Sequence, residues 1–116
     1  MPSSPDSILA FVSPFKLKGY LLSPSHPVGS HKSVFFRALG YSAEAPQLLA
    51  KDLLALLHRN CQPAEVTRFG QKFTSTGTLT GPNGRSGCVR AIWIRLHHEA
   101  ALRFVTAFPG DPDHDL

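Results

Sequence analysis

The spacing of apolar residues changes near the middle of the chain, from a helical period to an alternating one. Within residues 42–58 a stripe of leucines recurs every three or four positions, as on the buried face of a helix. These leucines are Leu49, Leu53, Leu56 and Leu57. An earlier helix over residues 30–39 has Ser30 as a suitable N-cap and Gly40 as a C-terminal stop. The first half therefore predicts two helices.

Beyond residue 60, apolar and polar residues alternate, as in strands with one buried face. The stretches with this pattern are residues 65–69, 72–80, 85–96 and 102–108. In the third stretch we expect Ile92 and Ile94 to be buried against the helices. The predicted fold class is α+β, with two main N-terminal helices packed on one face of a four-stranded antiparallel β-meander.

The strongest turn signal is Leu-Thr-Gly-Pro-Asn-Gly-Arg at residues 79–85, because Pro-Asn-Gly suits the central positions of a tight turn. The strand that follows carries three arginines and a tryptophan. Side chains alternate along a strand, so Arg85, Trp93 and Arg95 share one face and Arg90 lies on the other. Such a strand is either an amphipathic outer surface, with arginine stems over apolar area, or the floor of an anion site.

A chain of 116 residues is long enough for one domain with a single core. We expect that domain to cover residues 1–110, with residues 1–7 as a mobile tail and residues 111–116 as an acidic C-terminal tail. Without the three aspartates of that tail, 12 basic side chains face five acidic ones, which favours a polyanionic partner such as RNA.

Two cysteines without metal-type spacing favour a reducing compartment, and we expect a cytoplasmic protein. No apolar stretch is long enough to span a bilayer, so we expect no membrane contact. The five acids of the body are not clustered, and no glycine-rich phosphate loop occurs. We therefore expect neither a metal nor a cofactor.

A second group of candidate residues surrounds the start of the first predicted helix. His26, His31 and Lys32 lie at or just before this helix N-terminus, where free backbone amides favour an anion. Lys32 also heads an apolar stripe of the helix, which directs its amine to the edge of the core. These side chains become a credible site if they face the arginine-bearing strand.

Several motifs occur together in a fixed order. In the front half they are His26-Pro27-Val28-Gly29, Lys32, Phe35-Phe36 and Leu39-Gly40. In the back half they are the turn at residues 79–85, the strand Val89 to Trp93 and the closing strand at residues 104–109. Together they resemble a small bacterial family of unknown function, whose members are stand-alone proteins or the C-terminal tips of haemagglutinin-like toxins. Phe108 stands where this family more usually has tyrosine, so we assign no catalytic hydroxyl there.

The predicted layout is also similar to that of the barnase–EndoU–colicin–RelE superfamily of RNases. This resemblance implies a toxin-like, metal-independent endoribonuclease that cleaves RNA through its 2′-hydroxyl. The catalytic residues would be His26 for proton transfer, Lys32 and Arg85 at the phosphate, and Thr106 as a hydrogen-bonding group. The substrate-binding residues would be His31, Arg90, Trp93 and Arg95, and Trp93 would stack a base if its face of the sheet is open.

The same residues also fit a non-catalytic module that binds nucleic acid or protein and is toxin-associated or immunity-like. Its partner would be a cognate antitoxin or immunity protein. Such a module would tolerate loss of His26. The two hypotheses differ in one geometric requirement. Catalysis needs His26, Lys32, Arg85 and Thr106 to converge within one cleft, whereas a binding module does not.

Overall fold

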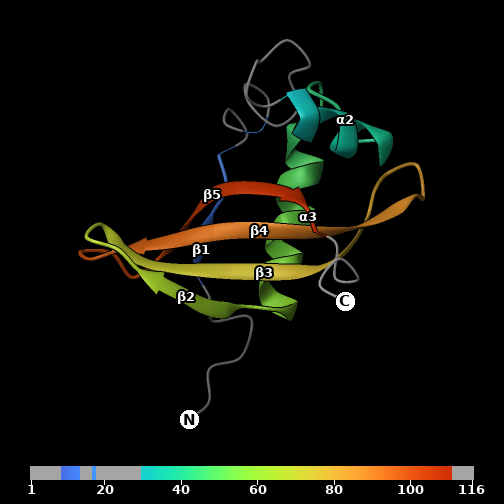
Figure 1. Cartoon of the computed structure of the whole chain (residues 1–116). Helices are drawn as coiled ribbons and strands as arrows, with labels where there is room; N and C mark the ends of the chain where they lie inside the picture. Colours follow the sequence, from blue (N-terminus) through green and yellow to red (C-terminus); the bar gives the residue numbers. More distant parts are fainter. Residues whose placement is uncertain (1–8, 14–16, 18–29, 111–116) are drawn as a thin grey trace, which may run out of the picture.

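A computed structural model describes residues 9–13, 17 and 30–110, except for the side chains of residues 30–33. The described elements form one five-stranded sheet with a 14-residue helix behind it (Figure 1). In chain order they are β1 (Ala10–Phe11), α2 (Ser30–Ala38), α3 (Pro46–Arg59), β2 (Gln62–Val66), β3 (Gly70–Thr80), β4 (Ser86–Leu96) and β5 (Leu102–Pro109). The predicted tails, residues 1–7 and 111–116, lie outside the described residues.

The strand order is β1-β5-β4-β3-β2. β2, β3, β4 and β5 pair with their sequence neighbours in antiparallel fashion. β1 pairs in parallel with β5, with Ala10 opposite Leu102, so the sheet is mixed. The pairing of β4 with β5 shifts register between Ile92 and Trp93, which leaves an extra residue in β5 between Phe104 and Thr106.

The predicted four-stranded antiparallel meander with two helices on one face is therefore wrong. The sheet has a fifth strand in parallel pairing, and one long helix covers it. The other helix, α2, has nine residues and lies at the end of the sheet that carries the β3–β4 turn (Figure 1). The apolar run at residues 8–12 indicates a short strand from the sequence, but so short a run does not show which strand it pairs with or in which direction, so the four-stranded meander left it out.

The stripe of leucines predicted for the long helix is confirmed. Leu49, Leu53, Leu56 and Leu57 are all buried against the sheet. The helix begins at Pro46 and not at Ser42, because proline is favoured in the first turn, where its missing N–H has no intrahelical partner to lose.

The face of β4 that packs on α3 is the opposite of the one we predicted. Val89, Ala91 and Trp93 are fully buried there, whereas Ile92 and Ile94 are half-buried on the other face. Both faces of β4 carry apolar residues, so alternation defines two sets without deciding which is inside. Turning the large Trp93 ring inward removes more apolar area from water than burying an isoleucine does.

The β3–β4 turn is fastened to the C-terminal end of α2. Asn83 donates its backbone N–H to the carbonyl oxygen of Leu39 at 3.3 Å and its side-chain amide to that of Ala38 at 3.0 Å. Carbonyls at a helix C-terminus have no intrahelical donor, so Asn83 caps α2 from a distant part of the chain. Gly81 passes so close that a Cβ there would lie 1.9 Å from the Leu39 oxygen. The Gly-Pro-Asn-Gly motif therefore positions α2 on the sheet.

Candidate functional site

The structure places two of the four predicted catalytic side chains, and it does not bring them together. His26 lies outside the described residues, and Lys32 lies on α2 with its side chain outside them. Arg85 is exposed at the end of the β3–β4 turn, whereas Thr106 lies opposite Ile92 in the sheet. The seven steps from residue 85 to residue 92 span about 23 Å in an extended strand. Arg85 and Thr106 therefore cannot contact the same phosphate.

The predicted substrate-binding residues also fall in different places. The side chain of His31 lies outside the described residues. Trp93 is fully buried in the core, so it cannot stack a base. Arg90 and Arg95 are both exposed, but they lie on opposite faces of β4, and the Arg95 guanidinium lies 5.4 Å from the centre of the Phe73 ring. These residues do not form one binding surface.

The sheet face opposite α3, which we term the open face, is the larger candidate surface. Figure 1 views the sheet from this side, with α3 behind it and no described helix in front. The central strands β3, β4 and β5 define it with side chains that share this face by register. These residues are Lys72, Thr74, Thr76, Thr78, Cys88, Arg90, Ile92, Ile94, Arg103, Thr106 and Phe108.

The open face has an apolar centre beside an exposed cation. Ile92, Ile94 and Phe108 are half-buried, and Arg90 lies between Thr76 on β3 and Phe108 on β5. The Arg90 side chain is exposed, and its guanidinium makes no hydrogen bond or ion pair with the described part of the chain. An apolar centre with a polar, arginine-bearing rim is the usual composition of a protein–protein interface.

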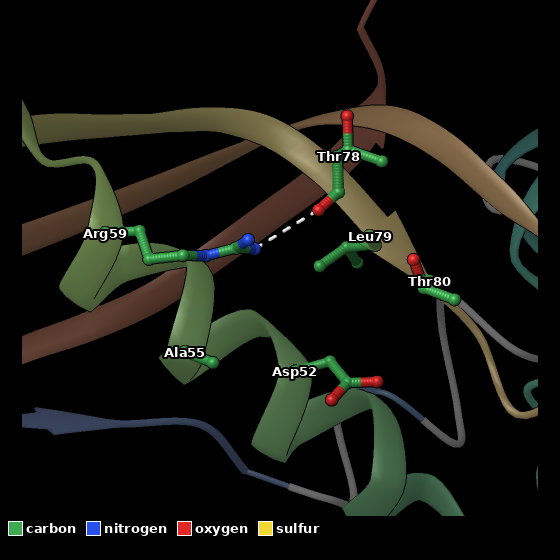
Figure 2. A pocket seen from close by; sticks show the side chains of 6 residues that line it. All are labelled: Asp52, Ala55, Arg59, Thr78, Leu79 and Thr80. Carbon is green, nitrogen blue, oxygen red and sulfur yellow. Dashed lines mark hydrogen bonds between the residues drawn. The ribbon is translucent and has the colours of Figure 1, made fainter.

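A groove of about 360 Å³ lies at the edge of β3, on the side of α3 (Figure 2). Its lining residues are Asp52, Ala55 and Arg59 from α3 and Thr78, Leu79 and Thr80 from β3. The Asp52 carboxylate accepts a hydrogen bond from the hydroxyl of Tyr41. Burial, and then this hydrogen bond, raise the pKa of the Tyr41 phenol above its ordinary value. Tyr41 therefore stays neutral and acts as a fixed donor.

Neither surface shows the arrangement of a catalytic centre. The groove is lined by one acid and one base, with no histidine or cysteine among its lining residues. Within residues 9–13, 17 and 30–110, no group of three or more His, Cys, Asp or Glu side chains is close enough to hold a metal ion. None of the described helices is long and apolar enough to cross a membrane.

Sequence reasoning missed the groove, although a signal was present. Threonines alternate at positions 74, 76, 78 and 80, a pattern that indicates a strand but not whether its edge is paired. The length of β2 decides that point, and β2 ends its pairing with β3 at Thr74. A single sequence does not define how far a neighbouring strand extends.

Two comparisons bear on the fold and the family. One similar solved chain belongs to a contact-dependent growth inhibition toxin–immunity protein complex from Klebsiella pneumoniae 342, with a TM-score of 0.65 and 15% identity. The similarity covers 85% of this chain and 98% of that one, and at this identity it shows the fold alone. No curated protein matches the chain. A family model matches residues 4–111, so the chain belongs to the family described as a domain of unknown function, DUF6883.

Proposed function

We propose that this chain is a non-catalytic protein-binding module of the toxin–immunity type, and that it binds an acidic partner protein through the open face. The observation that carries the proposal is the open face itself. It presents Ile92 and Ile94 beside the exposed guanidinium of Arg90, which has no ion-pair partner in the described part of the chain. The fold supports the proposal, because a chain of similar fold occurs in a complex of a growth inhibition toxin with its immunity protein.

The composition of the open face favours a protein partner over RNA. Single-stranded RNA is bound mainly by exposed aromatic side chains that stack bases, together with a track of cations. Among the residues that define the open face, Phe108 is the one aromatic side chain, and it is half-buried. Trp93, the other candidate for stacking, lies in the core. Aliphatic side chains and threonines match a protein surface better.

The size of the open face indicates how a partner must bind. The part of β3, β4 and β5 that carries its residues measures about 14 by 23 Å, or roughly 300 Å², from strand spacing and rise. A stable interface buries about 800 Å² on each partner. A partner that covers the open face must therefore also contact a neighbouring surface of the domain.

The test uses a charge reversal and a matched control. Arg90→Glu changes the open face, and Arg68→Glu makes the same change at an exposed position in the turn between β2 and β3. Proteins bound by the immobilised wild type are identified, and the purified partner is titrated against all three chains. We expect an acidic partner, at least tenfold weaker binding by Arg90→Glu and unchanged binding by Arg68→Glu. Equal affinity of wild type and Arg90→Glu would reject the proposal.

The endoribonuclease hypothesis predicts a different result and is tested in parallel. Wild type and His26→Ala are incubated with a mixed RNA pool in the presence of a chelator. A binding module leaves the RNA intact in both samples. Cleavage by the wild type that is lost in His26→Ala would establish the nuclease and replace the binding module.

A further inference from the structure

Part of β3 has a strand neighbour on only one side. β3 pairs with β4 along its whole length, from Gly70 opposite Leu96 to Thr80 opposite Ser86. On its other side, β2 pairs only as far as Thr74, which lies opposite Gln62. Among the described residues, no strand lies beside residues 75–80 on that side, and this stretch is an open sheet edge.

The hydrogen bonds of this edge identify which backbone groups face outward. In antiparallel strands the N–H and C=O of one residue point to the same side, and the side alternates along the chain. The N–H of Thr76 donates to the side-chain oxygen of Asn60 at 2.9 Å, and the carbonyl of Thr78 accepts from Arg59 at 3.1 Å. Residues with even numbers therefore face the edge. The N–H of Thr78 and both backbone groups of Thr80 have no partner in the described part of the chain.

The groove between this edge and α3 has room for another chain. Figure 2 shows the Thr78 carbonyl oxygen directed into the groove toward Arg59, while its side chain points away. Ala55 leaves space on the helix side because its side chain is a single methyl group. α3 packs tightly against β3 at Gly77, where a Cβ would lie 2.8 Å from a methyl carbon of Leu56. The groove lies along the next residues of β3, from Thr78 to Thr80.

We propose that this edge is a β-augmentation site, which takes an extended acidic segment of the partner protein as an extra strand beside residues 76–80. Added strands bind exposed edges through their backbone groups, and side-chain contacts supply the specificity. An N–H of the segment replaces Arg59 at the Thr78 carbonyl, and the released guanidinium pairs with a carboxylate of the segment. The number of satisfied groups increases, because Thr78 and Thr80 gain partners.

A partner segment fits this edge better than a second copy of the chain. Natural edges avoid self-association through charged side chains, proline or bulges. Residues 75–80 contain neither charge nor proline, and Arg59 supplies the only charge that contacts their backbone in the described structure. An antiparallel pairing of two copies centred on Thr78 would bring two Arg59 guanidiniums together, which is repulsive. An acidic segment meets no such repulsion.

The proposal rests on the proposed function for the source of the segment, but its test does not require the partner. The probe is an acetylated, amidated heptapeptide, Thr-Val-Glu-Val-Thr-Val-Thr, added to the full ¹⁵N-labelled chain. We expect saturable amide shifts centred on residues 76–80, and at least tenfold weaker binding of a copy with lysine in place of glutamate. A copy with methylated nitrogens at alternate residues should not bind, because it cannot donate to the edge.

Two variants make the test specific. Thr78→Pro removes the outward N–H and leaves the bonds to β4 intact, since that N–H does not face β4. We expect at least a tenfold loss of peptide binding, whereas Thr78→Val, which keeps the N–H, should bind like the wild type. If Thr78→Pro does not fold, Arg59→Glu decides the question, because it should reverse the preference between the glutamate and lysine peptides.

Three outcomes of the peptide experiments would overturn the proposal. They are equal peptide binding by Thr78→Pro, an unchanged peptide preference in Arg59→Glu, and shifts confined to the open face. A dimer of the chain alone, measured by light scattering at the concentrations used, would assign the edge to a second copy and also overturn it. If Thr78→Pro loses partner binding and Arg90→Glu does not, the partner binds the edge at residues 76–80 and the open-face proposal is rejected. The two proposals can therefore fail separately.

Discussion

Removing the Asn83 side chain should loosen α2 from the sheet. Asn83→Ala deletes the 3.0 Å hydrogen bond to the Ala38 carbonyl and the 2.9 Å bond that its Oδ1 accepts from the N–H of Arg85. Each such bond contributes about 0.5–1.5 kcal/mol net, and because Asn83 is exposed the lower half of that range applies. We expect a loss of about 1–2 kcal/mol in the free energy of unfolding. The backbone of Asn83 has negative φ, so alanine adds no backbone strain there.

The assay combines urea unfolding with amide hydrogen exchange. A loss of about 1–2 kcal/mol corresponds to a decrease of roughly 4–10 °C in Tm for a domain of this size. Exchange should accelerate in α2 more than in α3, because one of the deleted bonds reaches α2 and neither reaches α3. Asn83→Asp should be at least as destabilising as alanine, since it places a carboxylate beside helix C-terminal carbonyls. The control is Lys51→Ala, at an exposed position of α3. A loss of less than about 0.5 kcal/mol in the free energy of unfolding of Asn83→Ala would refute the capping role.

The remaining predictions concern the core and the dependence of stability on pH. Trp93→Ala should lower the free energy of unfolding by about 3–5 kcal/mol, because the ring is fully buried, whereas half-buried Ile92→Ala should cost clearly less in the same urea titration. Ser75→Ala should raise stability by about 1 kcal/mol, because the buried Ser75 hydroxyl has no hydrogen-bond partner in the described structure; a decrease would show that the hydroxyl is satisfied. The folded state raises the pKa of Tyr41 above that of the unfolded chain, so its contribution is complete below about pH 10 and is lost as the pH rises further. Tyr41→Phe should unfold with a weaker dependence on pH above 10, and identical alkaline profiles would exclude this role.

The features that the sequence determined by itself are those that depend on residues near one another in the chain. The leucine stripe of α3 follows from a spacing of three and four residues, and each leucine is buried as the period requires. The β3–β4 turn follows from Pro82, Asn83 and Gly84, and Gly84 has a φ of +86°. The strand stretches after residue 60 were found within a few residues, because alternation is a local pattern.

The features that only the tertiary structure decided depend on contacts between distant residues. β1 has two residues, and its parallel pairing exists only because β5 lies beside it. The choice of Trp93 over Ile92 for the core depends on the volume available under α3 and not on the period of β4. Asn83 caps Ala38 across 45 residues of sequence, so a motif that we interpreted only as a tight turn also holds a helix in place.

The candidate sites follow the same division. The sequence placed Arg85, Arg90 and Arg95 on one predicted strand, and all three are exposed. The extended backbone then separates Arg85 by about 23 Å from Ile92, which lies opposite Thr106. The open edge at residues 75–80 exists because the pairing of β2 with β3 extends only to Thr74. The residues that precede β2 in the chain belong to α3 and not to a longer strand. Local patterns specify where strands and helices form. Which face and which edge remain available for a partner depends on how far each neighbouring element extends, and only the packed structure contains that information.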